Sequence, residues 1–191
     1  MNTEQFYWIN QPQEFALDKG ALKIQTEPET DFWQKTHYGF SKANAPAFLT
    51  KIEGDFTFGV KTAFDTQNRY DQCGILLYID DENWIKVAVE HENEQYARLG
   101  SLVTNLGYSD WATVDIDAEK KTMWYRVQSK GVDVFIEYSE TGKRWEQMRI
   151  AHLHQFHGML AVGVYACSPS EGEGCEVLFD HVTVEFSFWI D

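Results

Sequence analysis

The side chains best suited to chemistry lie at every second position of residues 84–90, where Trp84, Lys86 and Glu90 alternate with aliphatic residues. A period of two is typical of a β-strand whose two faces have different surroundings. A tryptophan, an ammonium group and a carboxyl group on one face indicate a ligand platform rather than an ordinary solvated surface. Gln72 lies on the equivalent face of the preceding strand-like segment.

These two segments predict a β-hairpin whose aliphatic rows share one face. In the expected register Ile79 lies opposite Ile85, and residues 81–83 form a three-residue loop whose last residue adopts the left-handed conformation. The small residues Gly74 and Ala88 would then leave a hollow among the polar and aromatic side chains of the other face.

A hollow of this kind suits a sugar, because an aromatic ring covers the apolar face of the sugar while amide, carboxylate and guanidinium groups bind its hydroxyls. The residues predicted to bind the ligand come from the hairpin and from other strands and loops: Gln72, Trp84, Lys86, Glu90, Trp33, Asp110, Trp111 and Arg126. The alternative is a structural network, in which Glu90 pairs with Lys86 or Arg126 and Asp110 caps a loop.

Glycoside hydrolysis is the enzymatic alternative, since it requires two carboxyl groups about 5–5.5 Å or 6.5–9.5 Å apart. Glu90 with Asp110 or Asp71 is the candidate catalytic pair. No spacing in the sequence fixes these carboxyl groups together, so binding without catalysis is the favoured function.

Other chemistry has weaker support, and we predict neither a metal nor a cofactor. His152 and His154 share a strand face but lack a third ligand at a suitable spacing. Residues 80–83, three acidic residues and an asparagine, are explained by a hairpin turn without calcium. Motifs for phosphate binding, dinucleotide binding or a serine nucleophile are absent.

Composition excludes several partners. The chain has 191 residues, of which 43% are hydrophobic and 24% charged, and its formal net charge is -14. This acidity argues against nucleic acid or an anionic membrane as a partner. Three cysteines without a CxxC pair and an N-terminus without an export signal predict a cytoplasmic protein, with a Cys167–Cys175 bridge as the alternative for two of the thiols.

Short alternating segments separated by turn residues fill the chain, and no segment has a helical pattern over three turns. Strands are expected at residues 21–26, 47–52, 55–64, 70–79, 84–90, 97–104, 123–129, 132–138, 144–150, 159–166 and 176–186. With no linker or repeat in the sequence, residues 1–191 are predicted to form a single all-β domain, a β-sandwich of two antiparallel sheets. The expected core residues are Phe56, Phe58, Val60, Met123, Tyr125, Val127, Leu160, Val162, Val164, Val182, Val184 and Phe186.

Several blocks together resemble one family: TDFWQKTHYGF (residues 30–40), GDFTF (54–58), the hairpin (70–90), SDW (109–111) and GVYACSP (163–169). The set is similar to the regulation-of-enolase protein family of the concanavalin A-like lectin/glucanase superfamily. The resemblance covers nearly the whole chain. It implies a jelly-roll sandwich with one concave face, and glycans as ligands, because related domains accompany some glycosidases that act on xylans.

The resemblance also implies which positions recur in the family. They are Asp31, Phe32, Trp33, Tyr70, Asp71, Gln72, Trp84, Lys86, Glu90, Ser109, Asp110, Trp111, Arg126, Ser168 and Pro169. The family name implies a third function, regulation through contact with a metabolic enzyme. For that function the expected surface is the apolar C-terminal segment Phe188-Trp189-Ile190.

Overall fold

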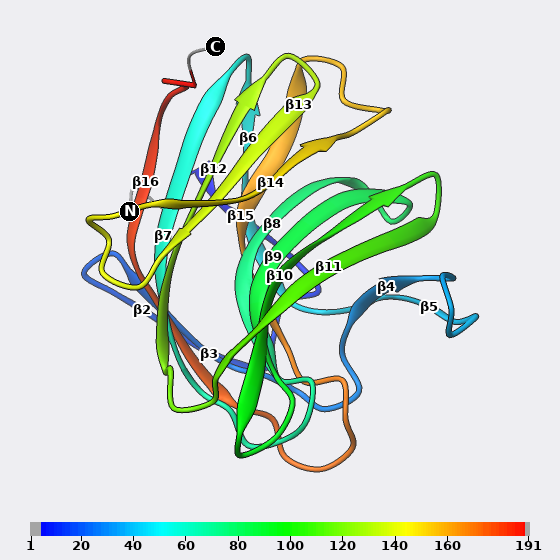
Figure 1. The fold of residues 1–191 in the computed structure, drawn as a ribbon, viewed down its shortest axis with the longest axis vertical. Coiled ribbons are helices and arrows are strands. Elements are labelled where there is room, and N and C mark those ends of the chain that lie inside the picture. Colours follow the sequence, from blue (N-terminus) through cyan, green and yellow to red (C-terminus); the bar gives the residue numbers. More distant parts are fainter. Residues whose placement is uncertain (1–4, 190–191) are drawn as a thin grey trace.

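The computed structural model describes residues 5–189, which form two large antiparallel sheets and a two-stranded ribbon (Figure 1). The first sheet has the order β1 (Tyr7–Ile9), β6 (Ala47–Glu53), β15 (Met159–Cys167), β8 (Gln72–Asp80), β9 (Asn83–His91), β10 (Tyr96–Asn105), β11 (Tyr108–Asp117). The second has the order β14 (Glu146–His152), β13 (Asp133–Ser139), β12 (Thr122–Lys130), β7 (Phe56–Asp65), β16 (Glu176–Phe186), β3 (Ala21–Gln25), β2 (Glu14–Asp18). The ribbon pairs β4 (Phe32–Gln34) with β5 (Ser41–Ala43). The predicted all-β fold of two antiparallel sheets is confirmed.

The main hydrophobic core lies between the two sheets and contains nine of the twelve predicted core residues, those on β7, β12 and β15. The three on β16 differ, because this strand has a β-bulge between Asp180 and Thr183. Beyond the bulge, Val184 is 46% exposed and Phe186 is 92% exposed, whereas Val182 is partly buried against the core. A bulge inserts an extra residue and changes which side chains reach the core, so simple alternation fails here.

The β8–β9 hairpin has the predicted faces and a different register. Leu77, and not Ile79, lies opposite Ile85, because a bulge near the end of β8 brings Asp80 opposite Asn83. The loop therefore has two residues, and Asn83 does not adopt a left-handed conformation. The shift is an even number of residues, so the faces are preserved: the aliphatic row lies in the main core and the polar row on the opposite side of the sheet.

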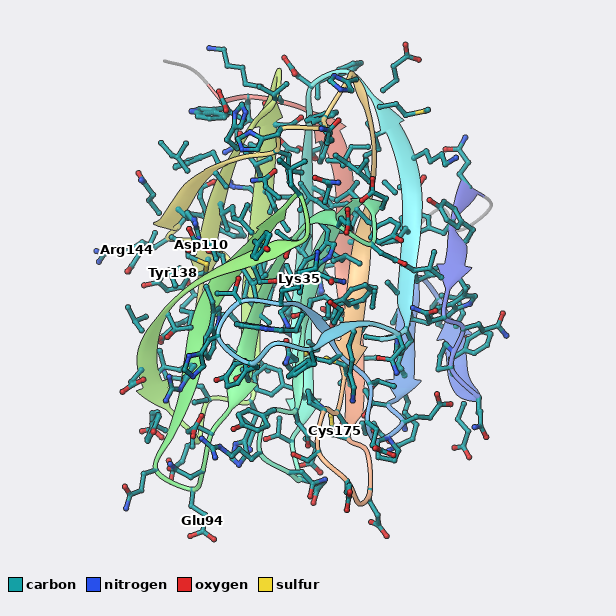
Figure 2. The ribbon with its side chains drawn as sticks, turned by 90° about the vertical axis from the view of Figure 1, so that its right-hand side faces the viewer. Lys35, Glu94, Asp110, Tyr138, Arg144 and Cys175 are labelled. Atoms are coloured by element: carbon teal, nitrogen blue, oxygen red, sulfur yellow. The ribbon has the colours of Figure 1, made fainter. Side chains whose placement is uncertain are left out.

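A second hydrophobic cluster lies on that opposite side, between the first sheet and the β4–β5 ribbon. Strands β8 to β11 curve towards the ribbon, which covers the concave face of the sheet (Figure 1). Figure 2 looks onto this face, with Lys35 of the ribbon in front of the sheet and Asp110 at its edge. The cluster is formed by Phe32, Trp33, Ala45, Ala47, Leu49, Leu76, Trp84, Ala88, Leu102, Ala161, Tyr165 and Cys167.

Five strands were not expected from the sequence: β1, β2, β4, β5 and β11. The most important for the site is β11, because the SDW segment lies in this edge strand and not in a loop. All three cysteines are buried and free, so the alternative Cys167–Cys175 bridge is not formed. The described part of the chain contains no helix long and apolar enough to cross a membrane.

Candidate functional site

A pocket of about 400 Å³ opens on the concave face, between the β4–β5 ribbon, the loop after β15 and strands β8 to β11. Its lining combines five aromatic side chains with a group of charged and amide side chains. The lining residues are Asp31, Trp33, Tyr38, Phe40, Lys42, Tyr70, Gln72, Lys86, Glu90, Leu102, Trp111, Pro169 and Ser170.

The polar floor of the pocket contains a chain of hydrogen bonds centred on Gln72. The Tyr165 hydroxyl donates to Gln72 Oε1 over 3.0 Å, and Gln72 Nε2 donates to Glu90 Oε2 over 3.0 Å. Gln72 Nε2 also donates to the backbone carbonyl of Tyr70 over 3.1 Å. Gln72 is directly opposite Glu90 in the β8–β9 ladder, which explains why the two side chains meet.

A buried ion pair completes the floor. Lys86 Nζ lies 3.4 Å from Asp31 Oδ1, and both side chains are almost entirely buried. Burial lowers the pKa of Lys86, but the attraction of Asp31 and Glu90 more than offsets this, so the pKa lies above its ordinary value. Lys86 is therefore a cation inside the site, and Asp31 compensates its charge.

Glu90 differs from Asp31 because its protein hydrogen-bond partner, Gln72, is uncharged. Burial raises the pKa of Glu90 from 4.5 to about 7, and the opposing attraction of Lys86 is not enough to offset it. Asp31 and Glu92 raise this pKa further, whereas Arg98 lowers it. At neutral pH the pocket thus holds a carboxyl group that is close to half protonated.

The walls are aromatic. Trp111 of β11 contacts Trp33 of the ribbon edge to face, with ring centroids 6.2 Å apart and planes at 89°. Trp33 contacts Tyr38 at 5.2 Å, and Tyr38 stacks on Phe40 at 6.0 Å. Tyr38 and Phe40 are 56% and 41% exposed, so their rings are available to a ligand. Such walls offer flat apolar surfaces above a polar floor.

Buried polar contacts fix the ribbon over the sheet. The Ser109 hydroxyl accepts a 2.9 Å hydrogen bond from the Gln34 backbone and lies 2.8 Å from Thr104 Oγ1. The Asn44 side chain accepts a 2.9 Å hydrogen bond from the Asp31 backbone, which positions the Asp31 carboxylate next to Lys86. Ser109, which the resemblance implied as a recurrent position, thus has a structural role in holding the ribbon.

Among the eight residues predicted to bind a ligand, the structure brings five to the pocket: Trp33, Gln72, Lys86, Glu90 and Trp111. Trp84 shares their face but is fully buried beneath the ribbon, where its ring lies 5.5 Å from that of Phe32 and Nε1 donates to the Asp81 carbonyl. The prediction that Trp84 stacks on a ligand is therefore wrong. The error arises because the covering ribbon was not predicted.

Arg126 belongs to the other sheet and does not reach the pocket. It forms a bidentate ion pair with Glu137, with Nε–Oε2 at 2.7 Å and Nη2–Oε1 at 2.9 Å. Its guanidinium group lies 4.2 Å from the centroid of Trp145 and 5.1 Å from that of Phe188. The expectation that Arg126 lies next to Glu90 is wrong. The error arises because sequence alone does not assign strands to sheets.

The two carboxyl partners proposed for Glu90 also lie outside the pocket. Asp110 projects from the edge strand β11, with a side chain that is 75% exposed and 3.3 Å from Arg149 Nη2. Asp71 is fully buried, and its Oδ2 accepts backbone hydrogen bonds from Gln67 and Asn68. Neither residue lines the pocket, so the predicted hydrolytic pairs with Glu90 are not formed.

Eight lining residues were not predicted to bind the ligand: Asp31, Tyr38, Phe40, Lys42, Tyr70, Leu102, Pro169 and Ser170. The resemblance implied Asp31, Tyr70 and Pro169 as recurrent positions without giving them a role. A usable signal was present, since residues 30–40 contain four aromatic side chains in eleven positions. That density is unusual for a segment with no predicted strand of its own.

Comparison with known proteins assigns the chain to a family. The family described as "Protein of unknown function (DUF1349)" matches residues 8–187. The chain belongs to this family. It is 35% identical over 181 residues to Regulation of enolase protein 1 of Saccharomyces cerevisiae, covering 93% of this chain and 89% of that protein. The resemblance stated from the sequence is confirmed.

Solved structures support the fold. A functionally unknown protein from Saccharomyces cerevisiae superposes with a TM-score of 0.91 and 29% identity, over 99% of this chain and 100% of that one. The GH43 BlXynB protein from Bacillus licheniformis superposes with a TM-score of 0.71 and 16% identity, over 95% of this chain and 37% of that one. The jelly-roll architecture of the DUF1349 family is therefore shared with part of a much longer protein.

Proposed function

We propose that this chain binds a carbohydrate or sugar derivative in the pocket on its concave face, without catalysing a reaction. The observation that carries the proposal is the combination of five aromatic side chains with the polar floor formed by Gln72, Lys86 and Glu90. Aromatic rings cover the apolar face of a sugar ring, and the floor supplies the hydrogen bonds that its hydroxyl groups need.

The charges of the floor favour an uncharged polar ligand. Lys86 and Asp31 compensate each other, and Glu90 is close to half protonated at neutral pH. An anionic ligand would find the buried ammonium group of Lys86 already paired with Asp31. Hydroxyl groups, in contrast, both donate and accept, and therefore match a floor that contains amide, ammonium and carboxyl groups.

The engagement of the second carboxyl group of the pocket supports binding over hydrolysis. The second carboxylate of the pocket, Asp31, is held by Lys86 and by the Phe32 backbone N–H, which donates to Oδ1 over 2.7 Å. Asp31 is thus already engaged as the counter-ion of Lys86. The likeness to GH43 proteins shows the fold alone, and here it serves to choose xylose-containing probes, since one of these structures is of an engineered GH43 glycoside hydrolase with endo-xylanase activity.

The test is isothermal titration calorimetry with xylobiose, cellobiose, maltose and digalacturonic acid. We expect at least one neutral disaccharide to bind, and Trp111→Ala to weaken that binding at least tenfold, which corresponds to loss of about 1.4 kcal/mol of stacking. Trp145→Ala is the matched control, because Trp145 is also partly exposed but lies against Arg126 on the other sheet. Equal loss of binding in both variants, or no binding at all, would refute the proposal.

Regulation of another protein is a second candidate function, favoured by the name of the yeast relative. The C-terminal surface predicted for it is partly covered, since Trp189 stacks on Phe135 at 5.5 Å and Phe188 lies against Arg126. Ile190 lies outside the described residues. A pull-down with metabolic enzymes, repeated with Trp189→Ala, tests this candidate separately from sugar binding.

A further inference from the structure

We propose that Glu90 binds the ligand in its protonated form, donating a hydrogen bond from Oε1 to an acceptor oxygen of the sugar, so that binding weakens as the pH rises. This inference rests on the proposed function and adds the role of one atom, the state in which it acts and the kind of ligand atom that it selects.

The first step is the orientation of the Gln72 amide. The backbone carbonyl of Tyr70 can only accept a hydrogen bond, so the amide nitrogen of Gln72 must face it. The amide oxygen of Gln72 then faces the Tyr165 hydroxyl, which donates to it. Both N–H groups of Gln72 are thereby used, one towards Tyr70 and the other towards Glu90 Oε2.

The second step is the position of the proton on Glu90. Because Gln72 Nε2 is a donor with no capacity to accept, Glu90 Oε2 must accept from it, and a proton on Oε2 would oppose that bond. The proton of the neutral acid therefore resides on Oε1. Glu90 lines the pocket and is partly exposed to it, so Oε1 is the oxygen left to meet a ligand.

The third step is the set of charged and titratable groups around Glu90. On its own strand Lys86 favours the carboxylate, while Glu92, directly after the strand, disfavours it. From the ribbon side Asp31 disfavours the carboxylate, and from β10 Arg98 favours it. From β8 and β15 the neighbours are uncharged at neutral pH: the Gln72 amide, and Tyr165 and Cys167, whose pKa values burial raises well above normal. Burial also raises the pKa of Tyr70, which lies two residues before β8, so this phenol is uncharged as well.

The two cations that lower the pKa of Glu90 are already engaged elsewhere, and Lys42, which also lines the pocket, donates to the backbone carbonyl of Glu29 over 3.1 Å. Lys86 pairs with Asp31, and Arg98 Nε lies 3.2 Å from Glu92 Oε2. Burial therefore dominates and raises the pKa of Glu90 to about 7. A bound sugar would displace water that still reaches the carboxyl group, which disfavours the carboxylate further. The neutral acid is then the form that the occupied pocket stabilises.

The test measures the affinity of wild type and Glu90→Gln from pH 6 to pH 9, using the member of the sugar panel that binds most tightly. In the variant, the new amide can accept from Gln72 through its oxygen and donate to the ligand through its nitrogen, as the neutral acid does. We expect wild-type affinity to fall by up to about a hundredfold over this range, ten-fold per pH unit above the pKa. We expect the affinity of the variant to be independent of pH over the same range.

Calorimetry in buffers of different ionisation enthalpy provides a second readout. At pH 8, wild type should take up nearly one proton per sugar bound, and Glu90→Gln should take up none. His37→Asn and His91→Asn are controls for the histidines on the ribbon turn and beside Glu90, and both variants should keep the wild-type pH dependence.

The inference is overturned if wild-type affinity is independent of pH or rises with it. It is also overturned if Glu90→Gln abolishes binding at pH 6, because an acceptor on the ligand would not distinguish the amide from the acid. Sugar binding itself would stand in both of those cases. Failure of the whole panel to bind at any pH would remove the proposed function and this inference together.

Discussion

The Glu90→Gln substitution should stabilise the ligand-free protein at alkaline pH and have little effect under mildly acidic conditions. Glu90 has a pKa near 7 in the folded protein and an ordinary value of 4.5. Between these values the folded protein binds the proton that the unfolded chain has released. The stability of wild type therefore decreases as the pH rises from about 4.5 to 7, and the loss is complete above the folded pKa.

The magnitude follows from the size of the shift. A change from 4.5 to about 7 corresponds to about 3 kcal/mol, at roughly 1.4 kcal/mol for each pKa unit. Glu90 is partly exposed to the pocket, so water there screens part of the cost, and we expect about 1–3 kcal/mol. For a domain of this size that corresponds to an increase of roughly 3–10 °C in Tm at pH 8.

Differential scanning fluorimetry and urea unfolding from pH 5 to pH 9 provide the assay. The matched control is Glu94→Gln, because Glu94 is an exposed glutamate in the turn after β9, at the bottom of Figure 2. The control should follow the wild-type curve at every pH. An equal change in Tm for Glu90→Gln at pH 5 and pH 8 would show that Glu90 ionises normally, and the reasoning about the pocket floor would be refuted.

Four further substitutions test other parts of the account by urea unfolding or calorimetry. Trp84→Ala should lower the free energy of unfolding by about 3–5 kcal/mol, because it empties a buried site beneath the ribbon; a loss below 1 kcal/mol would contradict that burial. Lys86→Met should cost about 3 kcal/mol by leaving Asp31 unpaired, and adding Asp31→Asn should restore most of it; no restoration would contradict the ion pair. Gly74→Ala should cost at least about 2 kcal/mol, since the added Cβ would lie 1.8 Å from the Val87 carbonyl oxygen; unchanged stability would contradict this close approach. Ser109→Ala should weaken sugar binding more than Thr104→Ala, because only Ser109 accepts from the ribbon backbone; the reverse order would contradict its anchoring role.

The alternation of apolar and polar residues predicted most of the large strands and the correct faces of the β8–β9 hairpin, because a sheet with a core on one side imposes a period of two. The register was wrong because a bulge near Asp80 shortens the loop to two residues. The same kind of irregularity on β16 left Val184 and Phe186 exposed. Bulges depend on local backbone geometry, and apolar patterns do not encode them directly.

The candidate site was predictable only in part. Gln72, Lys86 and Glu90 share a hairpin, so local spacing was enough to place them on one face. The ribbon was not predictable by the same argument, because its strands have only three residues each, too few for a recognisable period. This single omission explains both the burial of Trp84 and the missed contribution of Asp31.

Strand order explains the remaining errors. Arg126 lies on β12, in the middle of the other sheet, and no local pattern assigns a strand to one sheet or the other. Asp110 lies on the sheet that carries the pocket, but in its edge strand, where its side chain contacts Arg149. Long-range topology, and not residue type, decides which charged groups meet in a sandwich.

A crystal structure of the protein soaked with the tightest-binding disaccharide tests the central claim most directly. The account predicts a sugar ring enclosed by Trp33, Tyr38 and Trp111, with an oxygen of the ligand within hydrogen-bond distance of Glu90 Oε1. A sugar bound on the outer face of the other sheet, near Trp145, or density that contacts neither Glu90 nor Lys86, would contradict it.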